Sequence, residues 1–371
     1  MVTRILITGG AGFIGSHLAE QLLASGYSVR ILDNLSLQVH PSGNWPDYLT
    51  ADAERIRGDV RDASTVARAL QGVEVVVHLA ARVGVGQSMY EMTSYTEVND
   101  VGTAALMEAL ARNPVRRLVC ASSMSVYGEG LARNADGQMV NPEERDAEQL
   151  RRGEWELRGP GGEGLEPLPT PENKQPSLSS IYALNKYCQE RLSLIAGRAY
   201  GIPTIAFRFF NVYGPNQALS NPYTGVLAIF AARLLNGRPP LVYEDGKQRR
   251  DFVHVRDVAR ACRIAIEADK DTIGVFNIGS GKSRNILSIA RDLAAVMGRS
   301  EITPHVLGKF RAGDIRHCFA DISKAKAKLG FIPEVDFSDG LSELAEWLAG
   351  QVADDGIERA TAELEQRGLV A

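Results

Sequence analysis

Short apolar runs alternate with longer segments of helical periodicity over residues 1–210. The runs are rich in Val and Ile, which is typical of strands buried in a parallel sheet, and parallel strands are usually connected by helices. The pattern therefore predicts an α/β fold built on a doubly wound parallel sheet. The expected strands are residues 4–7, 28–32, 55–57, 73–78, 117–121 and 204–208, and the expected helices are residues 12–25, 63–70, 94–112 and 180–200.

The pattern becomes mixed beyond residue 213, with expected helices at residues 226–236 and 257–267 and expected strands at residues 250–254 and 275–278. We expect residues 1–213 to form the large domain. Residues 214–348 are expected to form a smaller, mixed α/β C-terminal lobe that faces the substrate, with some segments near residues 250–280 returning to the large sheet. Residues 349–371 are rich in charge and are expected to form a peripheral tail, either a surface helix or a frayed end.

One segment, residues 129–176, departs from this alternation and is rich in Gly, Pro, Glu and Arg. Such a composition seldom packs, so one interpretation is a solvated surface excursion. The other interpretation is a flap over the active site, because the segment lies between the two catalytic motifs described below.

Composition excludes several classes of protein. The chain has 371 residues, 44% hydrophobic residues and a formal net charge of −4, which is typical of a globular protein and gives no basic excess for a nucleic-acid partner. No run of apolar residues is long enough to span a membrane. The four cysteines are scattered without a Cys-x-x-Cys pair, so we expect reduced thiols and no metal site. The N-terminus leads directly into a strand without a signal-peptide pattern, which favours a cytoplasmic location.

The first strand is followed by a glycine-rich turn that opens a helix, in which Gly9, Gly12 and Gly15 are spaced three apart. Glycines at this spacing allow a tight turn, a close approach of backbone N–H groups to a pyrophosphate, and close packing of helix on strand. Asp33 ends the second strand, where a carboxylate binds the ribose hydroxyls and repels a 2′-phosphate. The motif therefore predicts a Rossmann-type dinucleotide site that prefers NAD to NADP; the alternative for Asp33 is a capping role.

A second motif places Tyr182 and Lys186 one helical turn apart, and residues 122–128 bring serines to the end of the fifth strand. The carboxyl ends of strands are where ligands bind in open α/β sheets. A nearby ammonium favours a phenolate, so we expect Lys186 to lower the pKa of Tyr182 enough for it to act as a base. Ser123 is expected to hydrogen-bond to the substrate hydroxyl.

Together these motifs resemble the extended short-chain dehydrogenases/reductases, and within them the UDP-galactose 4-epimerase-like sugar-nucleotide enzymes. The resemblance covers residues 4–348. It rests on residues 8–17, 33–34, 58–60, 78–81, 98–99, 122–128, 182–186, 208–215, 249–255 and 311–314.

The resemblance implies roles for individual residues. Ser123, Tyr182 and Lys186 would be catalytic. Asn211, Arg250 and Arg311 would contact the nucleotide diphosphate and Asp314 a nucleotide ribose, with surface ion pairing as the alternative for the two arginines. The implied cofactor-binding set is Gly9, Gly12, Phe13, Ile14, Gly15, Asp33, Asn34, Asp59, Val60, Leu79, Ala80, Ala81, Asn99, Tyr182, Lys186 and Phe209, and the implied substrate-binding set is Ser123, Tyr182, Asn211, Arg250, Arg311 and Asp314.

Sister activities of these enzymes are disfavoured by single positions. The related dehydratases carry an Asp-Glu pair directly after the catalytic Ser or Thr, where this chain has Met124 and Ser125. The related decarboxylases carry a glutamate at the position of Ser125, and the related reductases use NADPH, which Asp33 disfavours. What remains is redox-neutral inversion of a sugar carbon with bound NAD.

Residues 221–230, 244–250 and 311–318, together with the insertion at 129–176, are similar to bacterial dTDP-L-rhamnose 4-epimerases. This likeness implies a dTDP- or UDP-linked nucleotide sugar as substrate and, as the specific reaction, conversion of dTDP-L-rhamnose to dTDP-6-deoxy-L-talose. UDP-glucose or UDP-glucuronate 4-epimerisation is the alternative. A dehydratase or reductase of the same family and a non-catalytic NAD-binding sensor are further alternatives. The helices expected at residues 94–112 and 180–200 carry more apolar residues than one sheet face requires, and related enzymes dimerise through them, so we expect a homodimer.

Overall fold

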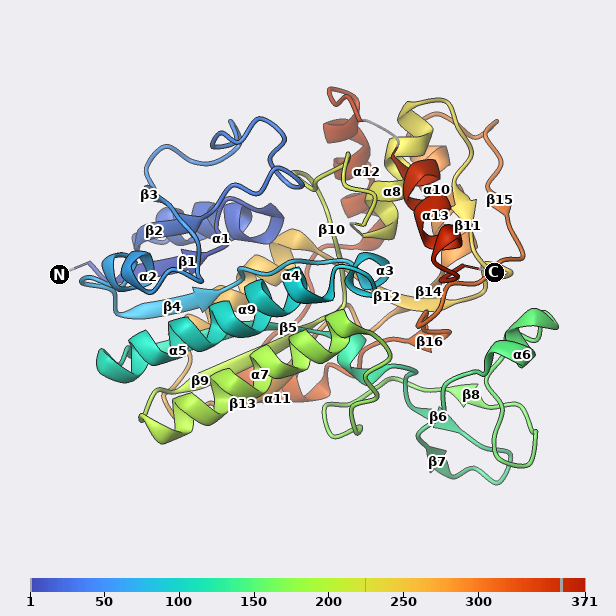
Figure 1. The fold of residues 1–371 in the computed structure, drawn as a ribbon, viewed down its shortest axis with the longest axis horizontal. Helices are drawn as coiled ribbons and strands as arrows, with labels where there is room; N and C mark the ends of the chain where they lie inside the picture. Colours follow the sequence, from blue (N-terminus) through green and yellow to red (C-terminus); the bar gives the residue numbers. More distant parts are fainter. Residues whose placement is uncertain (1, 224, 354–355, 371) are drawn as a thin grey trace.

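A seven-stranded, wholly parallel sheet forms the centre of the computed structural model, which describes residues 2–223, 225–353 and 356–370 (Figure 1). The strand order is β13-β9-β5-β4-β1-β2-β3. This arrangement confirms the predicted α/β class, and β13 confirms that the second half of the chain returns to the large sheet. The strands are β1 (Arg4–Thr8), β2 (Ser28–Asp33), β3 (Glu54–Arg57), β4 (Val75–His78), β5 (Arg117–Ser123), β9 (Thr204–Phe209) and β13 (Gly274–Ile278).

Helices cover both faces of the sheet because the strands are apolar on both sides. In β1, Ile5 and Ile7 lie in one apolar core and Leu6 lies in the other, as the alternation of side chains along a strand requires. The first core is covered by α1 (Phe13–Ala24), α9 (Val255–Glu267) and α11 (Ser323–Leu329), and the second by α2 (Ala63–Ala69), α5 (Gly102–Arg112) and α7 (Ile181–Ala199).

The helix expected over residues 94–112 is interrupted. The structure has α4 (Met92–Thr96), a π-helical turn (Glu97–Val101) and then α5. A π turn inserts one extra residue and shifts the faces of the helix on either side. Here the turn contains Asn99, which is fully buried, and the periodicity of apolar residues alone gave no sign of the shift.

The smaller lobe has its own apolar core, formed by three helices packed together. These are α8 (Val226–Leu235), α10 (Ile286–Val296) and α12 (Phe337–Leu348). Short strands connect the lobe to the rest: β12 (Arg249–His254) pairs with β10 (Asn211–Tyr213), β14 (Ser283–Asn285) and β16 (His317–Cys318), and β11 (Leu241–Val242) pairs with β15 (His305–Val306). None of the described helices is both long and apolar enough to cross a membrane.

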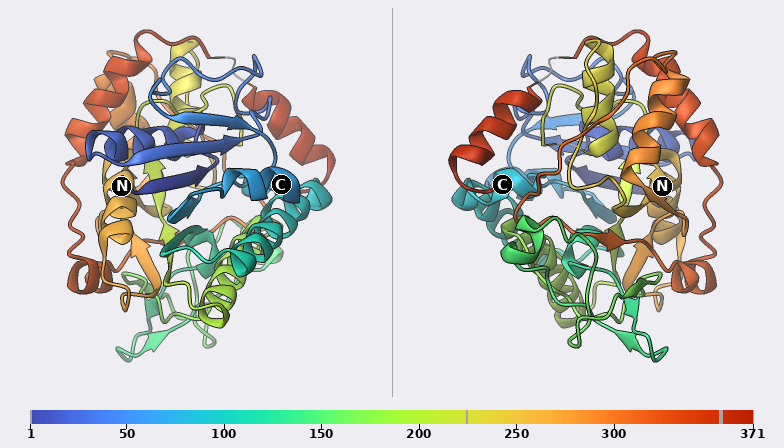
Figure 2. Two further views of the ribbon diagram at one scale, coloured as in Figure 1. Left: turned by 90° about the vertical axis from the view of Figure 1, so that its left-hand side faces the viewer. Right: turned by 90° about the vertical axis from the view of Figure 1, so that its right-hand side faces the viewer.

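The segment 129–176 is ordered and projects from the lower end of the molecule (green in Figures 1 and 2). It contains a small sheet of β6 (Ala132–Arg133), β7 (Met139–Val140) and β8 (Glu166–Pro167), the short helix α6 (Ala147–Arg151), and an apolar cluster. Its charged composition suggested a solvated loop. The structure shows instead that several of those charges are buried in ion pairs.

Arg316 is the centre of that ionic network and has a fully buried side chain. It contacts Glu244 at 2.8 Å, Asp245 at 2.7 Å, and Glu156 of the insertion at 2.5 Å. Arg145, also from the insertion, contacts Glu244 at 2.8 Å. The insertion is thus fastened to the smaller lobe by charge rather than by apolar burial.

We predict that Arg316→Met lowers the free energy of unfolding by about 3–5 kcal/mol, because removing one partner of a buried ion pair leaves uncompensated buried charge. Urea unfolding followed by circular dichroism measures the change. Arg152→Met is the matched control, since Arg152 and its partner Glu154 are both substantially exposed and the pair should contribute little. Equal urea midpoints for Arg316→Met and Arg152→Met would contradict the assignment of Arg316 as the centre of a stabilising ionic network.

Candidate active site

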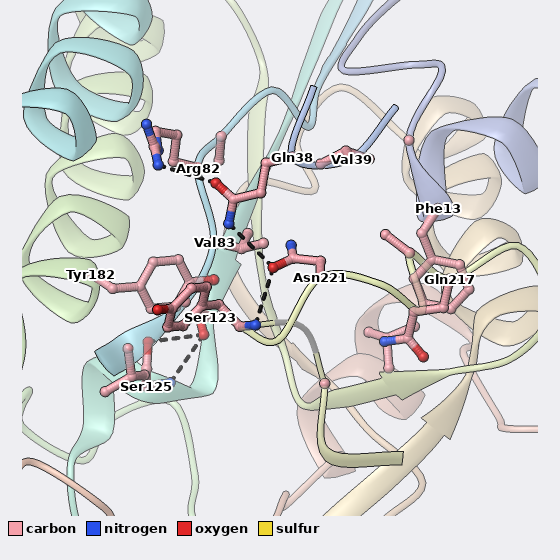
Figure 3. Close-up of a pocket in the computed structure, with 18 of the residues that line it drawn as sticks. Phe13, Gln38, Val39, Arg82, Val83, Ser123, Ser125, Tyr182, Gln217 and Asn221 are labelled. Atoms are coloured by element: carbon pink, nitrogen blue, oxygen red, sulfur yellow. Dashed lines mark hydrogen bonds between the residues drawn. The ribbon is translucent and has the colours of Figure 1, made fainter. Parts of the chain in front are cut away.

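A cavity of about 990 Å³ opens at the carboxyl ends of the parallel strands, between the sheet and the smaller lobe. Most of the residues singled out in the sequence meet there (Figure 3). The lining includes Gly9, Gly12, Phe13, Ile14, Gly15, Asp33, Asn34, Val60, Leu79, Ala80, Ala81, Ser123, Tyr182, Lys186, Phe209, Asn211, Arg250, Arg311 and Asp314. Asp59 and Asn99 are not among the lining residues.

The glycine turn between β1 and α1 leaves no room for side chains. Gly9 has a φ of +70°, and a Cβ there would lie 2.8 Å from the backbone of Ala80. A Cβ on Gly15 would lie 2.6 Å from the carbonyl oxygen of Gly9. Gly12 begins α1 without a side-chain cap, so the first N–H groups of the helix are free of a capping side chain. This cradle fits the pyrophosphate of a dinucleotide, whose negative charge a helix N-terminus stabilises.

Asp33 is held in place at the end of β2 by two backbone N–H groups. Ala11 donates to its Oδ2 at 3.0 Å and Leu35 donates to its Oδ1 at 2.9 Å. Burial raises the pKa of Asp33, and these hydrogen bonds act in the opposite direction. The carboxylate is therefore oriented before any ligand binds, which suits the recognition of ribose hydroxyls.

Asp59 and Asn99 lie behind the cavity wall and hold residues that line it. Asp59 accepts a hydrogen bond from Asn34 at 3.0 Å and pairs with Arg61 at 2.9 Å. The amide of Asn99 accepts from the Arg82 N–H at 2.7 Å and donates to the Arg82 carbonyl at 3.1 Å. Both side chains are thus engaged within the protein, and their expected contact with the cofactor stays a prediction.

A polar bridge missed by sequence reasoning connects the two sides of the cavity (Figure 3). Arg82 pairs with Glu91 at 2.6 Å and donates to Gln38 at 3.1 Å, and Gln38 donates to Asn221 of the smaller lobe at 3.2 Å. Gln38 and Asn221 are 183 positions apart, and no local pattern marks either of them.

Ser123 and Tyr182 face each other at the centre of the cavity (Figure 3). Ser123 ends β5, and its Oγ accepts hydrogen bonds from the backbone N–H of Ser125 at 3.1 Å and from its hydroxyl at 2.9 Å. Ser180 caps α7 by accepting from the Ala183 N–H, which places Tyr182 in the first turn of that helix. Burial raises the pKa of Tyr182 to about 12, and its hydrogen bond with Ser123 opposes this shift.

Lys186 does not produce the low pKa of Tyr182 that the sequence predicts. Its ammonium is buried and donates to the Gln189 Oε1 at 2.7 Å, and burial lowers the pKa of Lys186 to about 8. Burial, the largest cause, moves the pKa of Tyr182 in the direction opposite to the one that the sequence predicts, and Lys186 is engaged with Gln189.

The opposite end of the cavity is cationic. The guanidinium of Arg250 donates to the backbone carbonyls of Arg249, Ile315 and Arg316, which fixes its plane. Arg311 pairs with Asp314 at 2.8 Å and stacks over the Tyr243 ring, 4.6 Å from its centroid. Both arginines line the cavity, so simple surface ion pairing does not describe them.

Two segments lie elsewhere relative to the cavity than the sequence suggests. None of residues 129–176 is among those that line the cavity, so the cavity lining does not support the interpretation as a flap. Arg145 of the insertion donates to the carbonyl of Asp314, a lining residue, at 3.0 Å. Residues 349–371, expected as a peripheral tail, contain α13 (Ile357–Gln366), and this helix forms part of the cavity wall.

Comparison with known proteins agrees with this geometry. The model of the NAD dependent epimerase/dehydratase family matches residues 5–151 and 159–279. A dTDP-L-rhamnose 4-epimerase from Burkholderia thailandensis is 37% identical over 354 residues, covering 94% of this chain and 96% of that protein. The UDP-glucose 4-epimerase of Thermotoga maritima, solved with UDP-glucose, matches with a TM-score of 0.77 and 31% identity over 94% of this chain and 99% of its own. The UDP-glucuronic acid 4-epimerase of Bacillus cereus, solved with UDP-glucuronic acid and NAD, matches with a TM-score of 0.77 and 29% identity over 94% and 99%.

Proposed function

The chain belongs to the NAD-dependent epimerase/dehydratase family, and on that premise we propose that it converts dTDP-L-rhamnose into dTDP-6-deoxy-L-talose by inverting C4. Its activity is that of an NAD-dependent sugar-nucleotide epimerase. The observation that carries the proposal is the meeting of Ser123, Tyr182 and Lys186 in a cavity whose far end holds Arg250 and Arg311. The likeness to the Burkholderia thailandensis enzyme, at 37% identity, supports the choice of sugar.

When bound, NAD⁺ would supply a reversible hydride acceptor for C4 and a positively charged ring. The cradle of Gly9, Gly12 and Gly15 would hold its pyrophosphate, and Asp33 its adenine ribose. Lys186 would reach the nicotinamide ribose by exchanging its bond with Gln189. We assign these roles from the cavity lining and the contacts described above.

The chain's own residues would manage the proton and the orientation of the sugar. Ser123 would hydrogen-bond to the C4 oxygen, and Tyr182 would take the C4 hydroxyl proton as the hydride leaves and give it back after the sugar has turned. Arg250 and Arg311 would hold the diphosphate through both half-reactions, so that the 4-keto sugar turns about a fixed point. Neither Met124 nor Ser125 supplies an acid that could expel a hydroxyl, which separates this site from a dehydratase.

Tyr182→Phe should lower kcat by two or more orders of magnitude with little change in KM, because the lost group acts on the transition state rather than on binding. Steady-state kinetics with the nucleotide sugar measures this split. Tyr187→Phe is the matched control: the same substitution, in the same helix, at a residue that does not line the cavity. Near-normal turnover by Tyr182→Phe would remove this mechanism.

An isotope experiment tests the reaction and the substrate together. Internal return of hydride predicts that deuterium placed at C4 of dTDP-L-rhamnose stays at C4 in the product. Turnover in deuterated water should put no label there, as nuclear magnetic resonance of the product can show. UDP-glucose and UDP-glucuronate are run in parallel. Solvent label at C4 would overturn the hydride mechanism, whereas conversion of only the UDP sugars would overturn the choice of substrate.

We also propose a homodimer formed through α5 and α7, which pack side by side. Apolar side chains are exposed on α7 and at the turn just before α5: Leu184 at 47%, Ile195 at 52% and Val101 at 52%. Leu184 and Ile195 are eleven positions apart and so lie on one stripe of α7. Such a concentration on one face is unusual for a surface that meets only water.

Leu184→Arg combined with Ile195→Arg should convert the dimer into a monomer at micromolar concentration, since paired copies would bury like charges. Light scattering measures the mass. Ile273→Arg, at another apolar residue that is 58% exposed and lies outside α5 and α7, controls for the added charge. A monomeric mass for the unaltered protein would refute the proposal.

A further inference from the structure

The helix α13 closes one side of the cavity with an apolar face. Ile357, Ala360 and Leu364 are all buried, Leu364 being 5% exposed, and all three line the cavity. They recur every three or four residues, which places them on one face of the helix. The two views of Figure 2 show α13 (red) beside the segment that carries α3 (Val85–Ser88) and α4.

Contacts on both sides hold α13 across the opening. On the sheet side, a Cβ built on Gly86 of α3 would lie 3.3 Å from Leu364, so glycine lets the helix approach closely. Glu363 accepts hydrogen bonds from Tyr90 at 3.1 Å and from Tyr223 of the smaller lobe at 3.2 Å. The helix therefore joins the two halves of the site.

The same helix lies near the reacting centre. Leu364 packs against Gly86, and two residues further along α3 the hydroxyl of Ser88 accepts a hydrogen bond from the backbone N–H of Tyr182 at 3.0 Å. The wall formed by Leu364 and α3 is thus attached directly to the first turn of α7. A sugar whose C4 faces Tyr182 presents its C5 substituent to a neighbouring wall of the cavity.

The segment after α13 holds the loop of Arg311. Ala312 donates its N–H to the Leu369 carbonyl at 2.9 Å, and Arg311 forms an antiparallel bridge with Val370. Lys309 pairs with Glu365 at 2.6 Å. The C-terminal segment is therefore in contact with both the loop of Arg311 and the wall formed by Leu364 and α3.

We propose that α13 is the element that selects the sugar's C5 substituent, and that its apolar face of Ile357, Ala360 and Leu364 favours a methyl group. This inference rests on the proposed function and adds the element that determines specificity for the sugar. A hydroxymethyl or carboxylate group placed against these side chains would lose its hydrogen bonds to water without replacement, whereas a methyl group loses none. The side chains lie outside residues 5–151 and 159–279, the part of the chain that the family model matches.

The test compares two substrates that differ only at C6, dTDP-L-rhamnose and dTDP-L-mannose. The unaltered enzyme should favour the 6-deoxy sugar in kcat/KM by about tenfold or more, as expected when one hydroxyl meets an apolar pocket. Leu364→Gln replaces the apolar side chain by a polar one of similar size and should reduce this preference about tenfold. A preference within twofold of the unaltered enzyme's would overturn the proposal.

Two further variants show whether a change in substrate preference comes from the apolar face of α13. Ala360→Ser adds a single hydroxyl to the same face and should shift the preference in the same direction, even if Leu364→Gln proves unstable in a thermal melt. Ala362→Gln adds an amide to the exposed face of α13 and should leave the preference unchanged. If Ala362→Gln shifts the preference as much as Leu364→Gln does, the effect comes from the helix as a whole and the apolar face is not the selector.

The substrate proposal can fail separately from this one. If the protein converts UDP-glucose and neither dTDP sugar, the choice of substrate is wrong. The matched pair then becomes UDP-glucose and UDP-6-deoxyglucose, and the expected direction for Leu364→Gln is the same. If no nucleotide sugar is converted, the proposed function and this inference are both overturned.

Discussion

The carboxyl ends of seven parallel strands meet at one edge of the sheet, and the chemistry of this protein is arranged along that edge. Parallel strands require crossover connections, so every loop that follows a strand emerges on the same side. Gly9 after β1, Asp33 at the end of β2, Ala80 after β4 and Ser123 at the end of β5 are thereby brought together from more than a hundred residues of chain. The close approach of Gly9 to Ala80 shows how little space remains, because a Cβ on Gly9 would lie 2.8 Å from the backbone of Ala80, just after β4.

The second half of the site depends on buried charge. Arg250 donates to backbone carbonyls and Arg316 pairs with carboxylates. The insertion supplies Glu156, which pairs with Arg316, and Arg145, which pairs with Glu244. Buried ion pairs add less to stability than their number suggests, because each ion has lost its hydration. In this site, the bonds to these carbonyls and carboxylates fix the direction in which the arginine side chains point. A guanidinium whose donors are fixed on three carbonyls keeps one orientation toward the cavity, which would suit the proposed binding of a diphosphate.

The sequence alone predicted the sheet, the glycine cradle and the position of Ser123 and Tyr182, because each of these is a local pattern that repeats in all such folds. The backbone geometry of the turn requires glycine at positions 9, 12 and 15, and the spacing of these glycines in the sequence identifies the turn. The contacts that Asp59 and Asn99 make within the protein could not be predicted in the same way. Their side chains point to Arg61 and Arg82 behind the cavity wall, and spacing places a residue near a ligand without saying which neighbour it binds.

Long-range packing accounts for the remaining differences. The insertion at 129–176 has the composition of a solvated loop, yet Arg145 is buried because Glu244, far along the chain, offers it a partner. The helix α13 has a charged sequence, and only the three residues Ile357, Ala360 and Leu364 reveal its buried face. No window of sequence contains the surface that covers them, since that surface comes from α3 and the smaller lobe.

Burial of Tyr182 opposes the ionised form that the proposed mechanism requires of a base. Each unit by which the pKa is raised corresponds to about 1.4 kcal/mol against the phenolate, and the pKa of Tyr182 is raised from 10.0 to about 12. A positive charge close to the phenol would favour the phenolate. In the proposed reaction Tyr182 takes a proton and later gives it back, so a raised pKa that makes removal of the proton harder makes its return easier by the same amount.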